Sequence, residues 1–257
     1  MNEIRITLLH LNLKAGLLAF NFTLLEQAIC AAAAADADWI ITPELCISGY
    51  QFNNIIGTAW IKEQPDEWMT HVCSLARSLR RVIWFAHPER DSAGNLYNSV
   101  FIIDASGTII GRHRKINTAA EPWASPGTSC ELVLWNTFKI GNLICSDAYT
   151  SEVTQALCSK GAQLLVSPAA WAPGLNGPDG EWEQRTIETG LSLIVCNRTG
   201  TEQTLSFELG ESLVIRNGER LLAHRSQSSA LLLFNWNLEK MTPNSSEFQV
   251  EYLPSMA

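Results

Sequence analysis

The chain has 257 residues, of which 46% are hydrophobic and 17% charged, and its formal net charge is −8. A chain of this size and apolar content can bury a core without disulfide or metal staples, which excludes a disordered or collagen-like protein. The acidic balance argues against nucleic-acid or anionic membrane partners, because both require a basic surface.

The first part of the chain predicts a β-α-β unit. Residues 4–11 are an apolar strand, and residues 21–35 carry apolar side chains at helical spacing. Residues 39–42 form a second short strand, which Pro43 ends. A helical crossover between neighbouring strands implies that the two strands are parallel.

Strands and helices continue to alternate along the rest of the chain. Further helices are expected over residues 65–79, 151–159 and 179–190, and further strands over residues 82–86, 97–104, 108–113, 137–144, 164–167 and 193–196. Hairpins are expected at residues 105–107 and at Asn217 and Gly218, a pair favoured in type I′ turns. The pattern predicts one α/β domain with mixed sheets over residues 1–257, with a polar C-terminal tail from about residue 244.

The cysteines and the chain's first residues indicate a compartment. The seven cysteines are odd in number and include no C-x-x-C pair, which fits reduced thiols better than disulfides or a zinc site. The histidines show no metal-binding spacing, and we expect neither a metal nor a cofactor. With no apolar stretch of membrane-spanning length and no signal-peptide pattern, we expect a soluble cytoplasmic protein without a membrane partner.

Three reactive residues each stand just past the end of a predicted strand. Glu44 follows residues 39–42, Lys115 follows residues 108–114, and Cys145 follows residues 141–144. In open α/β folds the carboxyl ends of strands project side chains into one crevice. We therefore expect a carboxylate, an ammonium and a thiol to converge.

Each of the three has a role in nucleophilic catalysis. A thiol is mostly protonated at neutral pH, so Cys145 needs a base before it can attack, and a sheltered Glu44 could accept its proton. Lys115 would stabilise the oxyanion that develops at a carbonyl. Taken singly, each residue has a plainer interpretation. Cys145 could be a small buried hydrophobe, Glu44 a solvated carboxylate in a turn, and Lys115 part of a solvated basic strand end.

The ordered set of motifs resembles the nitrilase superfamily, the carbon–nitrogen hydrolases. The motifs are Pro43-Glu44-Leu45-x-x-Ser48-Gly49-Tyr50, Gly111-x-x-Arg114-Lys115 and Gly141-x-Leu143-Ile144-Cys145-x-Asp147, followed by Asn197-Arg198-Thr199-Gly200. The resemblance covers roughly residues 4–235 and reverses the plainer interpretations.

The resemblance implies a four-layer αββα sandwich, with two mixed β-sheets flanked by helices, and a homodimer or higher homo-oligomer. It implies Glu44 as general base, Lys115 as oxyanion-stabilising lysine and Cys145 as nucleophile, with no metal or organic cofactor. The backbone N–H of Ser146 would be a second oxyanion donor. Members also carry a second glutamate after the lysine, a role assigned here to Glu121, whose alternative is a loop carboxylate.

The residues beside the nucleophile point to one branch of the superfamily. True nitrilases resemble Cys-Trp-Glu there, whereas Cys145-Ser146-Asp147 looks more like the amidase and carbamoylase branches. The expected activity is cysteine-dependent hydrolysis of a non-peptide C–N bond in a small amide, either an ω-amide or an N-carbamoyl compound. Alternatives are nitrile hydrolysis, acyl transfer to an amine, or a catalytically weak binding or regulatory protein.

Several other residues are weighed as part of the pocket or of the framework. Trp171 and Tyr50 follow strand ends and could bind substrate, although ordinary core aromatics are as good an interpretation. His113 faces the same way as Lys115 but is interpreted as packed or solvated, not catalytic. Arg185 and Glu188 are three apart on a helix and predict a structural ion pair.

Overall fold

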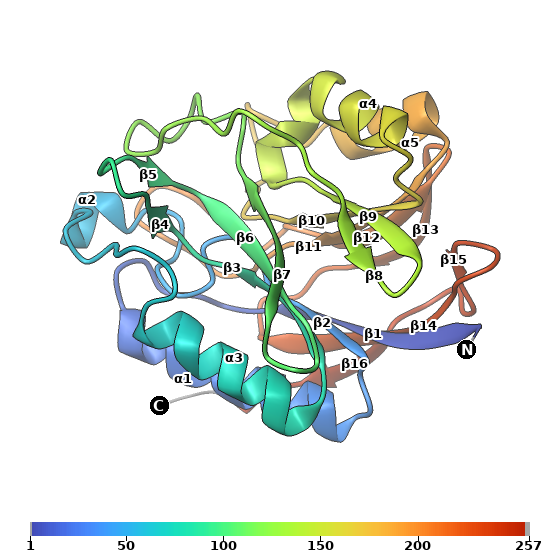
Figure 1. The fold of residues 1–257 in the computed structure, drawn as a ribbon, viewed down its shortest axis with the longest axis horizontal. Helices are drawn as coiled ribbons and strands as arrows, with labels where there is room; N and C mark the ends of the chain where they lie inside the picture. Colours follow the sequence, from blue (N-terminus) through green and yellow to red (C-terminus); the bar gives the residue numbers. More distant parts are fainter. Residues whose placement is uncertain (1, 255–257) are drawn as a thin grey trace.

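Two β-sheets stack face to face between two layers of helices in the computed structural model, which describes residues 2–254. Helices α1 and α3 cover one sheet, and α4 and α5 lie over the other (Figure 1). The predicted four-layer αββα sandwich with two mixed sheets is confirmed. No helix among residues 2–254 is long and apolar enough to span a membrane.

The first sheet has the order β15-β14-β1-β2-β3-β6-β7, with β16 also paired to β14. Its strands are β1 (Glu3–His10), β2 (Trp39–Ile41), β3 (Val82–Ala86), β6 (Ser99–Ile103), β7 (Ile109–Arg114), β14 (Ala230–Asn237), β15 (Thr242–Pro243) and β16 (Gln249–Tyr252). Strands β1, β2 and β3 are parallel, as the β-α-β pattern predicted, and the remaining pairs are antiparallel.

The second sheet has the order β13-β12-β11-β10-β9-β8. Its strands are β8 (Val133–Trp135), β9 (Phe138–Asn142), β10 (Leu164–Pro168), β11 (Ser192–Cys196), β12 (Ser212–Arg216) and β13 (Glu219–His224). Strands β9, β10 and β11 are parallel, and the predicted hairpin at Asn217 and Gly218 joins β12 to β13, both residues having positive φ. A separate ribbon pairs β4 (Glu89–Arg90) with β5 (Leu96–Tyr97).

The helices are α1 (Leu18–Ala34), α2 (Asn53–Ile56), α3 (Glu67–Leu79), α4 (Glu152–Ser159) and α5 (Glu181–Thr189), with a 3₁₀ turn, η1 (Cys145–Tyr149). The start of α3 is fixed by Asp66, whose carboxylate accepts the Met69 N–H (2.9 Å) and so satisfies one free donor of the first turn. The predicted ion pair on α5 is present, with Arg185 Nη2 2.6 Å from Glu188 Oε1.

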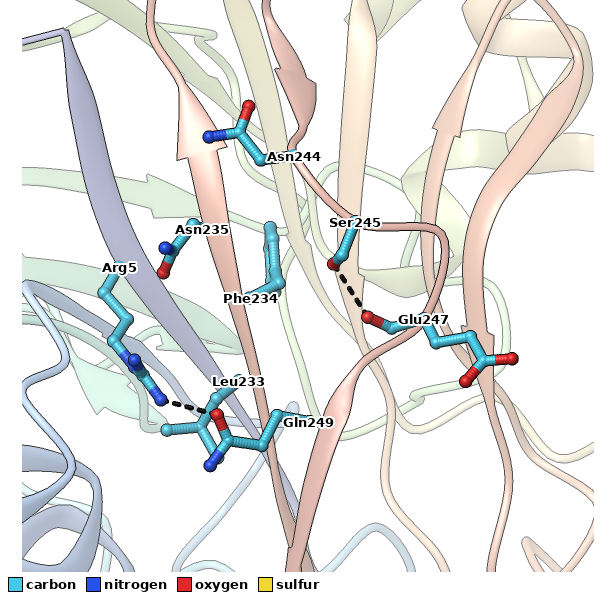
Figure 2. A pocket seen from close by; sticks show the side chains of 8 residues that line it. All are labelled: Arg5, Leu233, Phe234, Asn235, Asn244, Ser245, Glu247 and Gln249. Carbon is cyan, nitrogen blue, oxygen red and sulfur yellow. Dashed lines mark hydrogen bonds between the residues drawn. The ribbon is translucent and has the colours of Figure 1, made fainter.

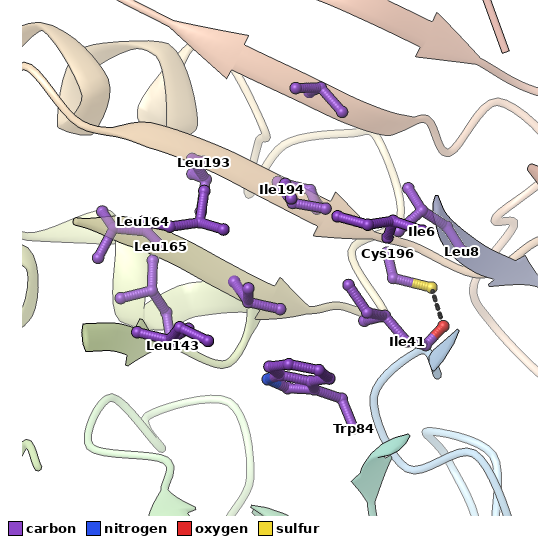
Figure 3. Close-up of a cluster of buried hydrophobic side chains, with 14 of the residues drawn as sticks. Ile6, Leu8, Ile41, Trp84, Leu143, Leu164, Leu165, Leu193, Ile194 and Cys196 are labelled. Carbon is purple, nitrogen blue, oxygen red and sulfur yellow. Dashed lines mark hydrogen bonds between the residues drawn. The ribbon is translucent and has the colours of Figure 1, made fainter. Parts of the chain in front are cut away.

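The core between the two sheets is built from alternate residues of the strands. From β2 and β3, Trp39, Ile41 and Trp84 face inward, whereas Ile40 and Ile83 face the helices. Strands buried on both faces read as continuous apolar runs, which explains their sequence. Figure 3 shows Ile41 beside Cys196 of the facing sheet, and Trp84 belongs to the same buried cluster as Leu143, which follows β9.

Polar contacts also join the two sheets. The indole N–H of Trp84 donates to Asn142 Oδ1 (2.8 Å) at the end of β9. The Cys196 thiol donates to the Ile41 carbonyl (3.1 Å, Figure 3). Buried polar groups need such partners, so these contacts fix how the strand ends of the two sheets align.

Several segments differ from the sequence-based expectation, among them residues 230–237, which form the strand β14 although no strand was expected there. Residues 133–135, where no element was expected, form β8, a short edge strand that pairs with β9 and whose Leu134 is exposed. The polar segment from residue 244 was expected to be a tail, but residues 249–252 form β16 on β14. An edge strand needs few apolar side chains, because its backbone pairing supplies most of its contacts.

Candidate active site

The three reactive residues meet where the two sheets end. Glu44 follows β2 after two residues, Lys115 follows β7 directly, and Cys145 opens η1 just past β9. All three side chains are at least 96% buried, and each lies within the electrostatic field of the other two. The convergence that the strand ends predicted is therefore present, while the catalytic roles remain predictions.

Glu44 is held by three donors. Its Oε1 accepts hydrogen bonds from Lys115 Nζ and Asn98 Nδ2, both at 2.7 Å, and its Oε2 accepts the Ala170 N–H at 2.8 Å. The residue after it, Leu45, has a φ of 49°, so the chain turns sharply at this point. Three fixed donors leave the carboxylate in one orientation and compensate for its complete burial.

Lys115 lies between two carboxylates. Its ammonium contacts Glu44 Oε1 (2.7 Å) and Glu121 Oε1. Burial opposes the charge, but the two carboxylates outweigh it and raise the pKa of Lys115 well above its usual value. Burial also raises the pKa of Glu121, against the opposing effect of Lys115. Lys115 is therefore a permanent cation next to the thiol.

Cys145 occupies a strained turn. Its φ of 47° is in the left-handed region, which costs a non-glycine residue roughly 1–2 kcal/mol. Burial and then the charge of Glu44 raise the pKa of the Cys145 thiol well above its usual value, against the opposing effect of Lys115. The thiol is thus neutral at rest and has to lose its proton to a neighbouring base during attack.

A buried carboxylate ties the cysteine turn to the lysine. Asp147 accepts hydrogen bonds from the N–H groups of Ile116, Asn117 and Ile144 (2.9 Å each) and from His113 Nε2 (2.7 Å). Burial opposes its charge, but the hydrogen bonds led by that from His113 outweigh it and lower the pKa of Asp147. The carboxylate therefore joins the segment around Lys115 to the one around Cys145. His113 is packed, as expected.

The predicted substrate-binding residues surround this cluster. Tyr50 lies with its ring centroid 5.9 Å from Lys115 Nζ. Trp171 follows β10, donates its indole N–H to the Asn176 carbonyl (2.9 Å) and packs edge-on against Tyr149 at 4.8 Å. Ser146 directs its hydroxyl to the Asn117 carbonyl (3.0 Å). Their contacts with substrate remain predictions.

Two residues near the cluster had no role in the sequence-based site. The Nδ2 of Asn98 donates both to Glu44 (2.7 Å) and to Glu121 Oε2 (2.8 Å) and so links the two glutamates. Tyr149 lies within the electrostatic field of Cys145. For Asn98, the available signal in the sequence was a polar residue directly before the buried strand β6. For Tyr149, it was an aromatic residue four positions after the nucleophile.

A surface cavity lies apart from the catalytic cluster. It has a volume of about 310 Å³ and borders β1, β14 and the segment before β16. In Figure 2, Arg5 reaches across to Gln249, with which it forms a hydrogen bond of 2.7 Å, and Glu247 projects away from them. None of its lining residues belongs to the Glu44, Lys115 and Cys145 cluster.

Known enzymes share both sequence and fold with this chain. Citrullinase of Francisella tularensis is 31% identical over 208 residues, which cover 72% of this chain and 70% of that protein. N-carbamoylputrescine amidase of Solanum lycopersicum is 28% identical over 249 residues, 86% and 82% of the two chains. 2-Oxoglutaramate amidase of Bacillus subtilis is 25% identical over 218 residues, 79% and 80%.

The structural and family comparisons agree. The amidase from Nesterenkonia sp. AN1 superposes with a TM-score of 0.81 at 23% identity, covering 90% of this chain and 92% of that one, which shows a common fold. A family model described as carbon-nitrogen hydrolase matches residues 5–242. The ordered motifs had predicted this relationship, and the chain belongs to the carbon–nitrogen hydrolase family.

Proposed function

We propose that this enzyme hydrolyses the C–N bond of a small amide or N-carbamoyl compound through a thioester on Cys145. The observation that carries the proposal is the buried group of Glu44, Lys115 and Cys145, in which a neutral thiol, a fixed carboxylate and a permanent cation share one site. A hydrolase of carbon–nitrogen bonds other than peptide bonds is also what its family membership indicates. The names of its relatives, amidases and a citrullinase, support the substrate class.

Acylation begins when Glu44 takes the proton of the Cys145 thiol and the sulfur attacks the amide carbonyl carbon. The C=O electron pair moves to oxygen, and the oxyanion is stabilised by the Lys115 ammonium and the Ser146 N–H. When the C=O bond re-forms, the C–N bond breaks, and Glu44 gives its proton to the departing nitrogen. A thioester on Cys145 and a free amine or ammonia result.

Deacylation uses the same groups. Glu44 removes a proton from water, the hydroxide adds to the thioester carbonyl, and a second oxyanion forms at the same position. Its collapse breaks the C–S bond, the sulfur regains the proton from Glu44, and the acid leaves. Glu121 and Asn98 keep Glu44 and Lys115 in place during both half-reactions, because each contacts one or both of them.

The test is to trap the acyl group on the cysteine. The wild-type enzyme is incubated with a panel of small amides and quenched in acid, and peptides are analysed by mass spectrometry for an adduct on Cys145. A Glu44→Gln variant, which lacks the base for acylation, should form no adduct. Acyl mass on that peptide, with none in a Cys145→Ala control, is expected. In the wild-type enzyme, water labelled with ¹⁸O should appear in the acid product. An unlabelled product transferred to an added amine would indicate an acyltransferase instead.

A selective chemical label provides an independent check. Iodoacetamide should inactivate the enzyme with carbamidomethylation of Cys145, and a saturating small amide should protect it. The six other thiols serve as internal controls. Cys46 and Cys196 are buried and donate to carbonyls, so they should react slowly, whereas exposed Cys30 can be labelled without loss of activity. Inactivation that tracks any other cysteine would contradict the assignment.

We also propose one catalytic domain that works as a homo-oligomer in the cytoplasm. A single family model over residues 5–242 supports the domain, and the seven free cysteines support a reducing compartment. Exposed apolar side chains such as Ile187 and Leu134, 57% and 61% exposed, are candidates for subunit contacts. Light scattering on the eluted protein measures the oligomeric state.

A further inference from the structure

The charge of the loops around the thiol bears on which amide the enzyme accepts. Five segments follow β2, β7, β9, β10 and β11 at the strand ends where the catalytic cluster lies: residues 43–52, 115–128, 143–151, 169–180 and 197–211. They contain two basic residues, Lys115 and Arg198, and seven acidic ones, a formal charge of −5. More than half of the chain's net charge of −8 is therefore concentrated there.

Both basic residues in these segments are already paired and buried. Lys115 contacts Glu44 and Glu121, and its side chain is 1% exposed. Arg198 contacts Glu202 and has no exposed side-chain surface. Removing either cation from its carboxylate would leave a buried charge uncompensated, which typically costs about 3–5 kcal/mol. Neither is available to hold a carboxylate on a substrate.

The Arg198–Glu202 pair has a different task, which is to fix the position of Tyr50. Glu202 also accepts the backbone N–H groups of Tyr50 (3.0 Å) and Gln51 (2.7 Å). Arg198 therefore acts on the position of Tyr50 through Glu202. The neighbouring segment 87–98 supplies Asn98, and two of its charged residues are also engaged. Glu89 pairs with Arg112 (2.9 Å) and Arg114 (2.7 Å), and Arg90 donates to the Ile61 carbonyl (3.0 Å).

Aromatic side chains lie near the catalytic cluster. Tyr50 lies by Lys115, and Tyr149 packs on Trp171, while Glu181 at the start of α5 lies within the electrostatic field of Tyr149. Aromatic faces attract cations, and an acidic rim raises the local concentration of positively charged ligands.

We propose, on the basis of the proposed amide hydrolysis, that the enzyme selects amides whose remote end is uncharged or cationic and discriminates against amides that carry a carboxylate. The proposal rests on the observation that Lys115 and Arg198 are both paired with carboxylates, in a site with acidic loops and aromatic side chains. The substrate class is thus a neutral or amine-bearing amide or carbamoyl compound.

Three amides of matched chain length test this selectivity: 5-aminopentanamide, pentanamide and 4-carbamoylbutanoate, which are cationic, neutral and anionic at pH 7. Ammonia release from the wild-type enzyme gives kcat/KM for each. We expect the cationic amide to exceed the anionic one by roughly tenfold or more at low salt, and the ratio to shrink in about 0.5 M salt. Equal or faster hydrolysis of the anionic amide overturns the inference and leaves the proposed function standing.

A charge variant at the rim gives the second readout. Glu181→Gln should raise the ratio of kcat/KM for the anionic amide to kcat/KM for the cationic amide about two- to fivefold, because one negative charge is removed near Tyr149. Glu239→Gln, an exposed carboxylate beyond β14, is the matched control and should leave the ratio unchanged. An unchanged ratio in Glu181→Gln contradicts the inference. If no amide is hydrolysed and none protects Cys145 from iodoacetamide, the proposed function fails and the selectivity fails with it.

Discussion

Replacing Asp147 with asparagine tests whether one buried carboxylate keeps the nucleophile and the lysine aligned. The carboxylate accepts four hydrogen bonds, two at each oxygen, and all four donors are protein groups. An asparagine has one acceptor oxygen, so its amide nitrogen would face two donors. Each buried donor left without a partner costs about 1–3 kcal/mol. The expected loss of unfolding free energy is therefore about 2–6 kcal/mol.

The assay is urea unfolding at pH 7, read by far-ultraviolet circular dichroism, together with the rate at which iodoacetamide labels Cys145. Asp104→Asn is the matched control. Asp104 also accepts two backbone N–H groups in a turn, from Ser106 (2.9 Å) and Thr108 (3.0 Å), but water can replace it there. We expect the Asp104→Asn control to lose less than about 1 kcal/mol of unfolding free energy.

A loss for Asp147→Asn as small as that of the control would refute the reasoning, since it would mean that the four donors find other partners. If the variant is too unstable to purify, the substitute measurement is the unfolding free energy of the wild-type protein as the pH is lowered. The pKa of Asp147 is lowered in the folded state. Its contribution to stability is therefore present above the ordinary aspartate pKa and is lost as the pH falls through the folded value.

Three further outcomes are expected. Lys115→Ala should lower kcat by about 10²-fold or more, measured by ammonia release, and a loss under tenfold would count against an oxyanion role. Glu121→Gln should keep the protein folded but lower kcat, because Lys115 loses one of its two carboxylate partners. Unchanged kcat and KM would contradict a role of Glu121 in catalysis. Burial and then the neighbouring His224 lower the pKa of His10 to about 4, so the unfolded chain binds a proton first as the pH falls below about 6.5. Wild-type unfolding free energy should drop by about 2 kcal/mol between pH 7.5 and 5 from this group, and urea titrations of His10→Asn should lack that part of the slope.

Most strand positions and strand ends could be predicted because burial leaves a direct trace in the residue pattern. Strands β3 and β11 are apolar at every position except Ser192, and each stops where a polar or reactive residue begins. The positions of Glu44, Lys115 and Cys145 follow from those stops. The order of the motifs then identified the family, and the family match confirms it.

The contacts that hold the site together could not be predicted, because they depend on groups far apart in the chain. Asp147 binds the backbone N–H groups of Ile116 and Asn117, and backbone donors carry no signal in the sequence. Asn98 was visible only as a polar residue before a strand, since its two carboxylate partners come from other segments. The edge strand β16 was missed for a related reason: it has few apolar side chains, and its contacts come from backbone pairing with β14.

The pairing of β1 with β14 has a consequence for synthesis of the protein. Glu3 lies opposite Asn237 and His10 opposite Ala230, so β1 pairs with a strand that is synthesised much later. Contacts that distant slow folding, because a very long loop must close before they form. Until then β1 presents an open apolar edge, and we expect nascent chains stopped before residue 230 to require chaperones and to be prone to aggregate.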